Sequence, residues 1–229
     1  MAISVDKVYQ QVLVLANKEQ RGYITPQEFN LLAPNAQMEI FEQYFYDENQ
    51  ADRNLKNSTQ FSNTDEMLDE KISVFKRTGP VTMGLGGVGT LPSLSYRLGM
   101  VYRPNSGIEV EQLTEEDMLY VRKTKLAKPD SKYPAYYRLN DKQIQVYPNI
   151  ANVRCNYIKK PQKPSWAYVV VNEKALYNAG GSIDFELHSS DESELVYKIL
   201  SLAGITIAKP GLGTYADQQI VGQKQQEKQ

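Results

Sequence analysis

The sequence contains few of the residues that build disulfide networks and metal centres, with one cysteine and one histidine among 229 residues. Cys155 therefore has no partner for a disulfide within the chain, and the counts exclude a zinc cluster of several cysteines and histidines. Such sparse cysteine usage predicts a protein that matures in a reducing compartment.

Long apolar runs and a charge excess are also missing. No apolar segment approaches the roughly 20 residues that span a bilayer, so we expect no membrane helix. The first residues, Met1–Asp6, lack a basic region followed by an apolar core, so we expect no signal peptide. The formal net charge of the whole chain is -1, which gives no global basic footprint for nucleic acid. The 16 tyrosines suit either strands or protein–protein interfaces, and both interpretations stay open.

The segment from Val5 to Tyr46 has the clearest pattern in the chain and predicts two amphipathic helices joined by a polar turn containing Gly22. Thr25 as N-cap, Pro26 in the first turn and Glu28 as the partner of a capping box mark the start of the second helix. Residues at helical spacing form the two faces predicted to be buried. They are Val5, Val8, Tyr9, Val12, Leu15 and Ala16 in the first helix, and Phe29, Leu32, Ala33, Ala36, Ile40, Phe41, Tyr44 and Phe45 in the second.

A third helix is predicted to cover this helical hairpin, because neither arm can bury its apolar stripe alone. Ser189 or Ser190 suits the N-cap of this helix, and Gly204 suits its end. The second helix is expected to continue through Pro34 with a kink, since its stripe keeps the same phase on both sides of the proline.

Short alternating segments predict a mainly antiparallel β domain between the helices. Trp166–Val171 is apolar enough for a central strand, Thr114 marks a short helix at Glu115–Lys123, and the glycine-rich segment Thr78–Thr90 is expected to be flexible. The other predicted strands are 71–77, 96–102, 108–112, 135–139, 143–147, 152–159 and 183–187.

The predicted fold is therefore α+β, with the N-terminal helical hairpin and the C-terminal helix packed as a small bundle and the β domain inserted between them. The predicted divisions are a hairpin at 1–47, a polar loop at 48–70 with a helical turn near 65–70, a β-rich domain at 71–188, a helix at 189–205, and an extended or disordered tail at 206–229.

Two motifs suggest chemistry, but each has a simpler structural interpretation. Gly84–Gly89 matches G-x-G-x-x-G, yet Pro92 breaks any following helix, so a loop is favoured over a dinucleotide site. His188 has Ser189, Ser190 and Asp191 beside it, which suit helix capping better than a catalytic triad.

Charged clusters give equally weak signals. The acidic pairs Asp65/Glu66, Asp69/Glu70 and Glu115/Glu116 fit solvated helix turns better than a glycosidase. A basic cluster of Lys159, Lys160 and Lys163 lies near Tyr157 and Trp166, but it does not extend into a stripe. We therefore assign no catalytic, cofactor-binding or metal-binding residue and expect no enzyme and no cofactor.

The blocks Asn17–Asn30 and Ala36–Phe45 resemble the N-terminus of virion structural proteins from crAss-like and marine podophages. Later blocks are similar, more loosely, to head–tail connector and tail-tube adaptor subunits of short-tailed phages; they are Tyr137–Leu139, Ile144–Pro148, Val153–Pro161 and Ile183–Leu187, followed by Glu194–Val196. The resemblance covers roughly residues 1–205.

This resemblance implies a virion protein of the neck or tail, assembled in the cytoplasm of the host bacterium. It implies a homo-oligomeric ring of about twelve copies, bound to the portal protein and to other neck or tail rings. Double-stranded DNA would pass through the channel without sequence-specific binding, and the family has no catalytic residues to transfer. Two other classes stay open: a virion cargo protein or receptor-binding tail adhesin, and a small cell-wall hydrolase.

Overall fold

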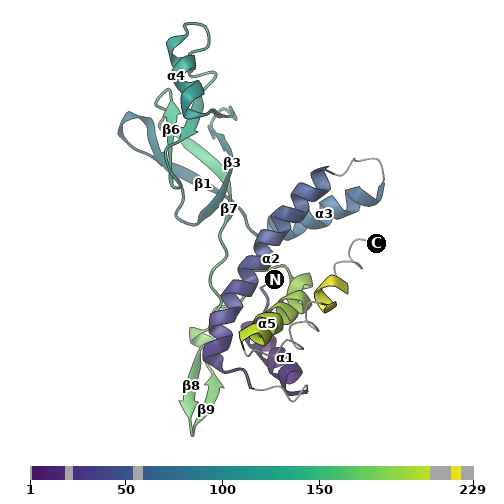
Figure 1. Ribbon diagram of the computed structural model, residues 1–229. Coiled ribbons are helices and arrows are strands. Elements are labelled where there is room, and N and C mark those ends of the chain that lie inside the picture. The colour runs from purple at the N-terminus through teal and green to yellow at the C-terminus, as the bar shows by residue number, and fades with distance from the viewer. Residues whose placement is uncertain (1, 19–22, 54–58, 207–217, 223–229) are drawn as a thin grey trace. The chain divides into compact units, whose positions relative to one another are not determined.

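The computed structural model describes residues 2–18, 23–53, 59–206 and 218–222, which belong to two compact units. The helical unit comprises residues 1–74 and 161–229, and the β unit comprises Phe75–Lys160 (Figure 1). The predicted α+β class is confirmed, with a mainly antiparallel sheet inserted between the N-terminal and C-terminal helices. None of the described helices combines the length and apolarity needed to cross a bilayer.

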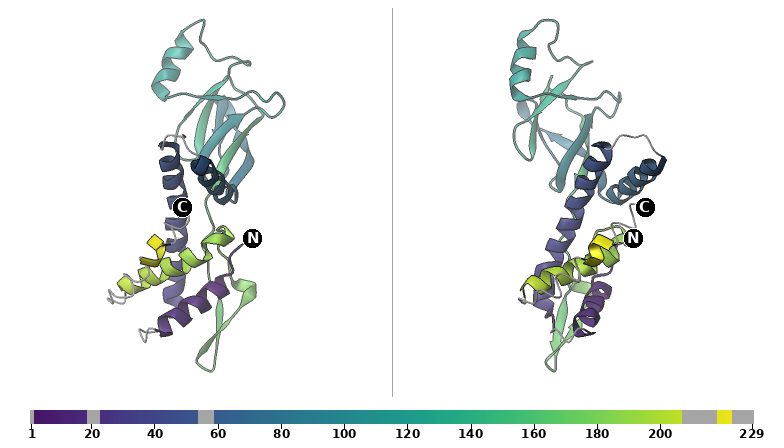
Figure 2. Two further views of the ribbon diagram at one scale, coloured as in Figure 1. Left: turned by 90° about the vertical axis from the view of Figure 1, so that its right-hand side faces the viewer. Right: turned by 45° about the vertical axis from the view of Figure 1, so that its right-hand side comes forward.

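The helical unit is built on α1 (Val5–Lys18), α2 (Pro26–Arg53) and α5 (Glu192–Thr206), and α5 packs against both α1 and α2 (Figure 2). The predicted buried faces of α1 and α2 are confirmed: all their positions are buried except Leu15 and Leu32, which are half-buried. The third helix is thus the cover that the amphipathic pattern required.

The start of α2 has the predicted capping box. The Thr25 amide donates to the Glu28 carboxylate at 2.8 Å, and the Glu28 amide donates to Thr25 Oγ1 at 3.2 Å. The helix continues through Pro34 as one element. The predicted turn around Gly22 lies outside the described residues.

The predicted ends of α5 are wrong. A short 3-10 turn, Ser189–Asp191, precedes the helix. The N-cap of this turn is His188, in place of the predicted Ser189 or Ser190, and the His188 side chain accepts a hydrogen bond from the Ser190 amide. Gly204 lies inside the last turn, where a glycine costs only about 1 kcal/mol relative to alanine and is tolerated.

The predicted polar loop at 48–70 is wrong over most of its length, because α2 continues to Arg53 and α3 spans Thr59–Ser73. The helical turn predicted near 65–70 is confirmed as part of α3, and residues 54–58 lie outside the described residues. A polar composition fits a surface helix as well as a loop, and α3 packs against α2. The predicted strand at 71–77 is correspondingly wrong at its start, since Lys71 and Ile72 are buried residues of α3.

The β unit contains a seven-stranded sheet in which every neighbouring pair is antiparallel except β4 and β5. The short helix α4 (Glu115–Lys123) begins after Thr114, as predicted. The sheet order is β3-β7-β1-β2-β6-β5-β4. The strands are β1 Lys76–Met83, β2 Val88–Thr90, β3 Ser95–Tyr102, β4 Glu111–Gln112, β5 Ala135–Arg138, β6 Gln143–Tyr147 and β7 Val153–Lys159.

The glycine-rich segment predicted to be flexible is part of this sheet. β1 and β2 form a hairpin there, joined by a 3-10 turn at Leu85–Gly87. Gly89 is required by packing, because a Cβ at this position would lie 2.6 Å from the Val81 side chain and 2.9 Å from Met83. The prediction failed because glycine serves close packing as well as mobility.

The segment Trp166–Val171, predicted as a central strand, is instead part of a two-stranded hairpin in the helical unit. Its strands are β8 (Tyr168–Val171) and β9 (Lys174–Tyr177), and β9 had no prediction. Residues 161–188 belong to the helical unit, so the β unit is shorter than the predicted β domain. The predicted strand at 183–187 is reduced to isolated bridges at Ile183 and Phe185.

Part of the C-terminal tail differs from the prediction of an extended or disordered segment. Residues 218–222 are helical, and Ile220 is buried. This short helix lies beside α5 in both figures (Figure 2). The rest of the predicted tail, apart from Thr206 at the end of α5, lies outside the described residues.

Candidate functional site

The G-x-G-x-x-G spacing at Gly84–Gly89 is explained by the tight β1–β2 turn. The Gly84 amide donates to the Val88 carbonyl at 2.7 Å, and Gly86 and Gly87 have φ of 75° and 83°, which favour glycine. A strand, β2, follows this turn. A dinucleotide fold needs a helix N-terminus at this place to bind the pyrophosphate, so the spacing serves the turn here.

His188, Ser190 and Asp191 lie together, but their order does not suit nucleophilic catalysis. His188 Nδ1 lies 2.9 Å from Ser190 Oγ, and that hydroxyl donates to Asp191 Oδ1 at 3.2 Å. A triad needs the histidine between the nucleophile and the carboxylate, whereas here the serine lies between the other two. The three residues therefore shape the start of α5.

Asp191 also belongs to a buried ionic cluster that the sequence did not reveal. Its carboxylate lies 2.9 Å from Lys71 Nζ and accepts a hydrogen bond from the Tyr44 hydroxyl. The three side chains come from α2, α3 and the turn before α5, so the cluster ties three helices together. Removing one partner would leave the other charge buried, which makes the cluster a structural element of the unit.

The predicted charged clusters are divided between the two units. Glu66, Asp69 and Glu70 are exposed on α3 of the helical unit, whereas Glu115 and Glu116 are exposed in the first turn of α4. The basic cluster is divided as well. Lys159, Lys160 and Tyr157 belong to the β unit, and Lys163 and Trp166 belong to the helical unit.

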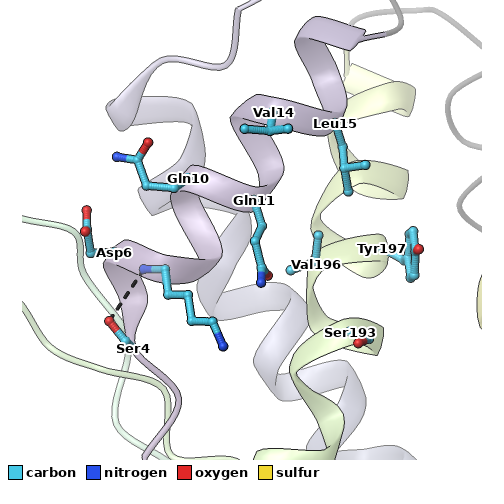
Figure 3. A pocket seen from close by; sticks show the side chains of 10 residues that line it. Ser4, Asp6, Gln10, Gln11, Val14, Leu15, Ser193, Val196 and Tyr197 are labelled. Atoms are coloured by element: carbon cyan, nitrogen blue, oxygen red, sulfur yellow. Dashed lines mark hydrogen bonds between the residues drawn. The ribbon is translucent and has the colours of Figure 1, made fainter.

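A groove of about 690 Å³ lies between α1 and α5 (Figure 3). Val14, Leu15 and Val196 form its apolar part. An ion pair between Lys7 and Glu192, with an N–O distance of 2.7 Å, bridges the two helices. The Lys7 hydrogen bond holds the pKa of Glu192 below its usual value. Nowhere in the described ranges do three or more His, Cys, Asp or Glu side chains gather as a metal site would require.

The β8–β9 hairpin of the helical unit exposes five apolar side chains. Asn172 and Glu173 form its two-residue turn with positive φ, which matches the twist of a tight hairpin. Its exposed apolar side chains lie on both faces of the ribbon, because adjacent strand residues point in opposite directions. They are Val169, Val170, Val171, Leu176 and Tyr177, and two of them, Val170 and Leu176, are 64% and 52% exposed.

The base of this hairpin is held firmly in the unit. The buried Trp166 ring stacks on Tyr168 and Tyr177 with centroid distances of 5.7 and 5.8 Å, and its Nε1 donates to Asp6 at 2.9 Å. The Asn30 side chain binds both backbone groups of Trp166, at 2.8 and 3.0 Å. The apolar arm is therefore presented from a rigid anchor.

Comparison with models of known protein families gave no match, and comparison with curated proteins gave no significant match. The candidate surface is the hairpin with the groove. Sequence reasoning missed it because apolar strand residues do not show which element will pack over their face of the sheet. The only available signal was the Asn172-Glu173 turn between two apolar runs.

Proposed function

We propose that the chain is a structural ring subunit of a bacteriophage neck or tail, a head–tail connector or tail-tube adaptor. Such a ring forms part of the channel for genome packaging, retention and ejection. The observation that carries the proposal is the anchored β8–β9 hairpin, whose apolar residues are exposed on both faces. The resemblance of Asn17–Asn30 and Ala36–Phe45 to podophage virion proteins supplies the kind of assembly.

An exposed hairpin of this composition is a natural interface element. A two-stranded hairpin in water is marginally stable by itself, and each large aliphatic side chain gains about 1.5–3 kcal/mol when it is fully buried. Val170 and Leu176, which are 64% and 52% exposed, would gain the corresponding part of this energy by leaving water. Contact with another protein surface would therefore stabilise both the hairpin and the assembly.

The partner that we propose for the hairpin is the α1–α5 groove of a neighbouring copy. The helical unit carries both the projecting hairpin and the concave groove, and the two features share no residue. A contact between two different surfaces of identical subunits is head-to-tail, and it closes into a ring when the rotation per subunit permits. Val14, which is exposed at the groove, would then contact the neighbour's valines.

The test is the mass of the purified chain in solution and of a hairpin variant, Val170→Asp/Leu176→Asp. We expect a multi-subunit species for the wild type and a monomer for the variant, measured by light scattering after gel filtration. The matched control is Leu85→Asp/Leu126→Asp, which places the same charges at fully exposed leucines of the β unit and should still assemble. A monomeric wild type, or an assembled hairpin variant, would overturn the proposal.

A further inference from the structure

The two units carry opposite net charges that cancel in the whole chain. Residues 75–160 contain 14 Lys and Arg against 7 Asp and Glu, a formal net charge of +7. The remaining 12 basic and 20 acidic residues give the helical unit a formal net charge of -8. A charge asymmetry of this size between parts of one chain indicates different partners for the two parts.

The positive charge of the β unit is concentrated on part of its sheet. Residues 75–108 and 142–160 contain no Asp or Glu, and they supply β1, β2, β3, β6 and β7. All acidic residues of this unit lie between residues 109 and 141. The basic residues of the acid-free part are Lys76, Arg77, Arg97, Arg103, Lys142, Arg154, Lys159 and Lys160.

The exposed face of the β3–β7–β1 strands gathers several of these cations. In the strand register, Lys76 of β1 and Arg97 of β3 both lie opposite Ile158 of β7, so they flank the same position. The exposed Arg154 lies further along β7 on this face. Because neighbouring strands are about 4.8 Å apart and β7 lies between the other two, the backbones of Lys76 and Arg97 are roughly 10 Å apart across the sheet.

A shallow groove of about 500 Å³ runs along this face between the cations. Thr78 and Asn156 are its polar uncharged lining residues besides Tyr157, and the Thr78 hydroxyl donates to the Asn156 side-chain oxygen at 2.8 Å. Gly99 lies at the wall, and a Cβ there would come within 3.1 Å of the Asn156 carbonyl oxygen. The glycine therefore keeps β3 close to β7 at this point.

We propose that this phosphate-binding face, formed by Lys76, Arg97 and Arg154 with Thr78 and Asn156, binds the backbone of double-stranded DNA without sequence preference. Arg, Lys, Thr and Asn are the side chains that contact DNA phosphates. The strands that form this face carry cations and contain no Asp or Glu, so their local charge favours a polyanion as the partner. The inference rests on the proposed function, since a channel subunit meets duplex DNA.

The binding test uses the full-length chain and a short fluorescent DNA duplex of mixed sequence, followed by fluorescence anisotropy at increasing salt. We expect a Kd near the micromolar range at low salt that weakens steeply as salt increases, which is typical of non-specific phosphate contacts. Lys76→Gln/Arg97→Gln/Arg154→Gln should weaken binding at least tenfold. It should also reduce the slope of log K against log salt by about 2–3, because each phosphate contact contributes about 0.9.

The matched control is Lys125→Gln/Lys128→Gln/Lys132→Gln, which removes the same charge from an exposed part of the same unit. This variant should bind DNA within about twofold of the wild type. Equal weakening by both triple variants would overturn the face as a site, because only net charge would then matter. Absence of wild-type DNA binding at low salt would overturn the proposal outright. If, in that case, the variant Lys76→Gln/Arg97→Gln/Arg154→Gln also loses self-association, the face binds the acidic unit of another copy instead of DNA.

The two proposals fail separately in this design. Sedimentation of the same samples without DNA reports assembly, and anisotropy reports DNA binding. DNA binding by a chain that remains monomeric would support the phosphate-binding face and contradict the ring. A ring that does not bind DNA would contradict the face and leave the ring standing.

Discussion

The helical unit and the β unit differ in net charge and in the kind of side chain that their surfaces expose. The helical unit is acidic, buries the amphipathic faces of α1 and α2 under α5, and exposes an apolar hairpin. The β unit is basic, and its cations Lys76, Arg97 and Arg154 lie on the exposed face of three strands. The whole-chain net charge of -1, which argued against a basic footprint, is therefore the sum of two units with net charges of opposite sign.

The chain contains one natural probe for each unit. Trp166, the single tryptophan, is buried in the helical unit, so its fluorescence reports unfolding there. Cys155, the single cysteine, is buried in the β unit, and burial raises the pKa of its thiol to about 11. Because the thiolate is the reactive form, labelling of Cys155 at neutral pH requires the β unit to open.

The largest expected effect is on the helical unit. Phe41→Ala removes a fully buried ring and should reduce the free energy of unfolding by about 3–5 kcal/mol. Denaturant titration followed by Trp166 fluorescence measures this change, and Cys155 labelling should shift much less. Tyr46→Ala, at an exposed position of the same helix, should cost no more than about 0.5 kcal/mol. An equal shift of both probes would break the comparison of two separate cores.

The buried ion pair of the helical unit should give an effect of similar size. Lys71→Met leaves the Asp191 carboxylate buried without its cation and should cost about 3–5 kcal/mol, measured by Trp166 fluorescence. The double variant Lys71→Met/Asp191→Leu removes both charges and should recover a large part of the loss. A double variant as unstable as the sum of the two single variants would show that the pair is not coupled.

A smaller effect should appear in the β unit. Gly89→Ala places a methyl group 2.6 Å from the Val81 side chain and should cost about 1–3 kcal/mol by overpacking. The rate of Cys155 labelling measures this cost as faster opening, while the Trp166 transition should hardly move. Gly84→Ala has more room, with its nearest atom at 3.4 Å, and is the control. Identical labelling rates for the two variants would refute the packing role of Gly89.

The smallest effect concerns the capping box of α2. The backbone and side-chain hydrogen bonds from Thr25 hold the pKa of Glu28 below its usual value. A carboxyl pKa that is lowered by folding stabilises the native state above the unfolded pKa, near 4.3, and this contribution is lost as pH falls through the lower native pKa. Glu28→Gln should therefore be less stable than the wild type at pH 7, with the difference shrinking below about pH 4. A constant difference across that range would contradict this assignment.

The sequence predicted those elements whose determinants are local. The 3.6-residue period located the buried faces of α1 and α2, and capping residues located the starts of α2 at Thr25 and of α4 at Thr114. Most of the α3 helix, beyond the turn predicted near 65–70, and the strand β9 were missed because neither has an apolar period strong enough to separate it from a loop.

The candidate surfaces depended on contacts between distant segments and could not be predicted in the same way. The strand register that aligns Lys76 with Arg97 and the charge division at residues 75 and 160 require the fold itself. The exposed state of Val170 likewise depends on which elements of the fold pack over the faces of the hairpin. Pairing partners of strands are non-local, so composition alone does not fix them.

The central claim is that identical copies of this chain associate head-to-tail into a closed ring. Electron microscopy of the purified full-length protein tests this claim most directly. The account predicts class averages with rotational symmetry around a central opening wide enough for duplex DNA, and the loss of these particles in Val170→Asp/Leu176→Asp. Single globular particles of one chain in the wild-type sample would contradict it.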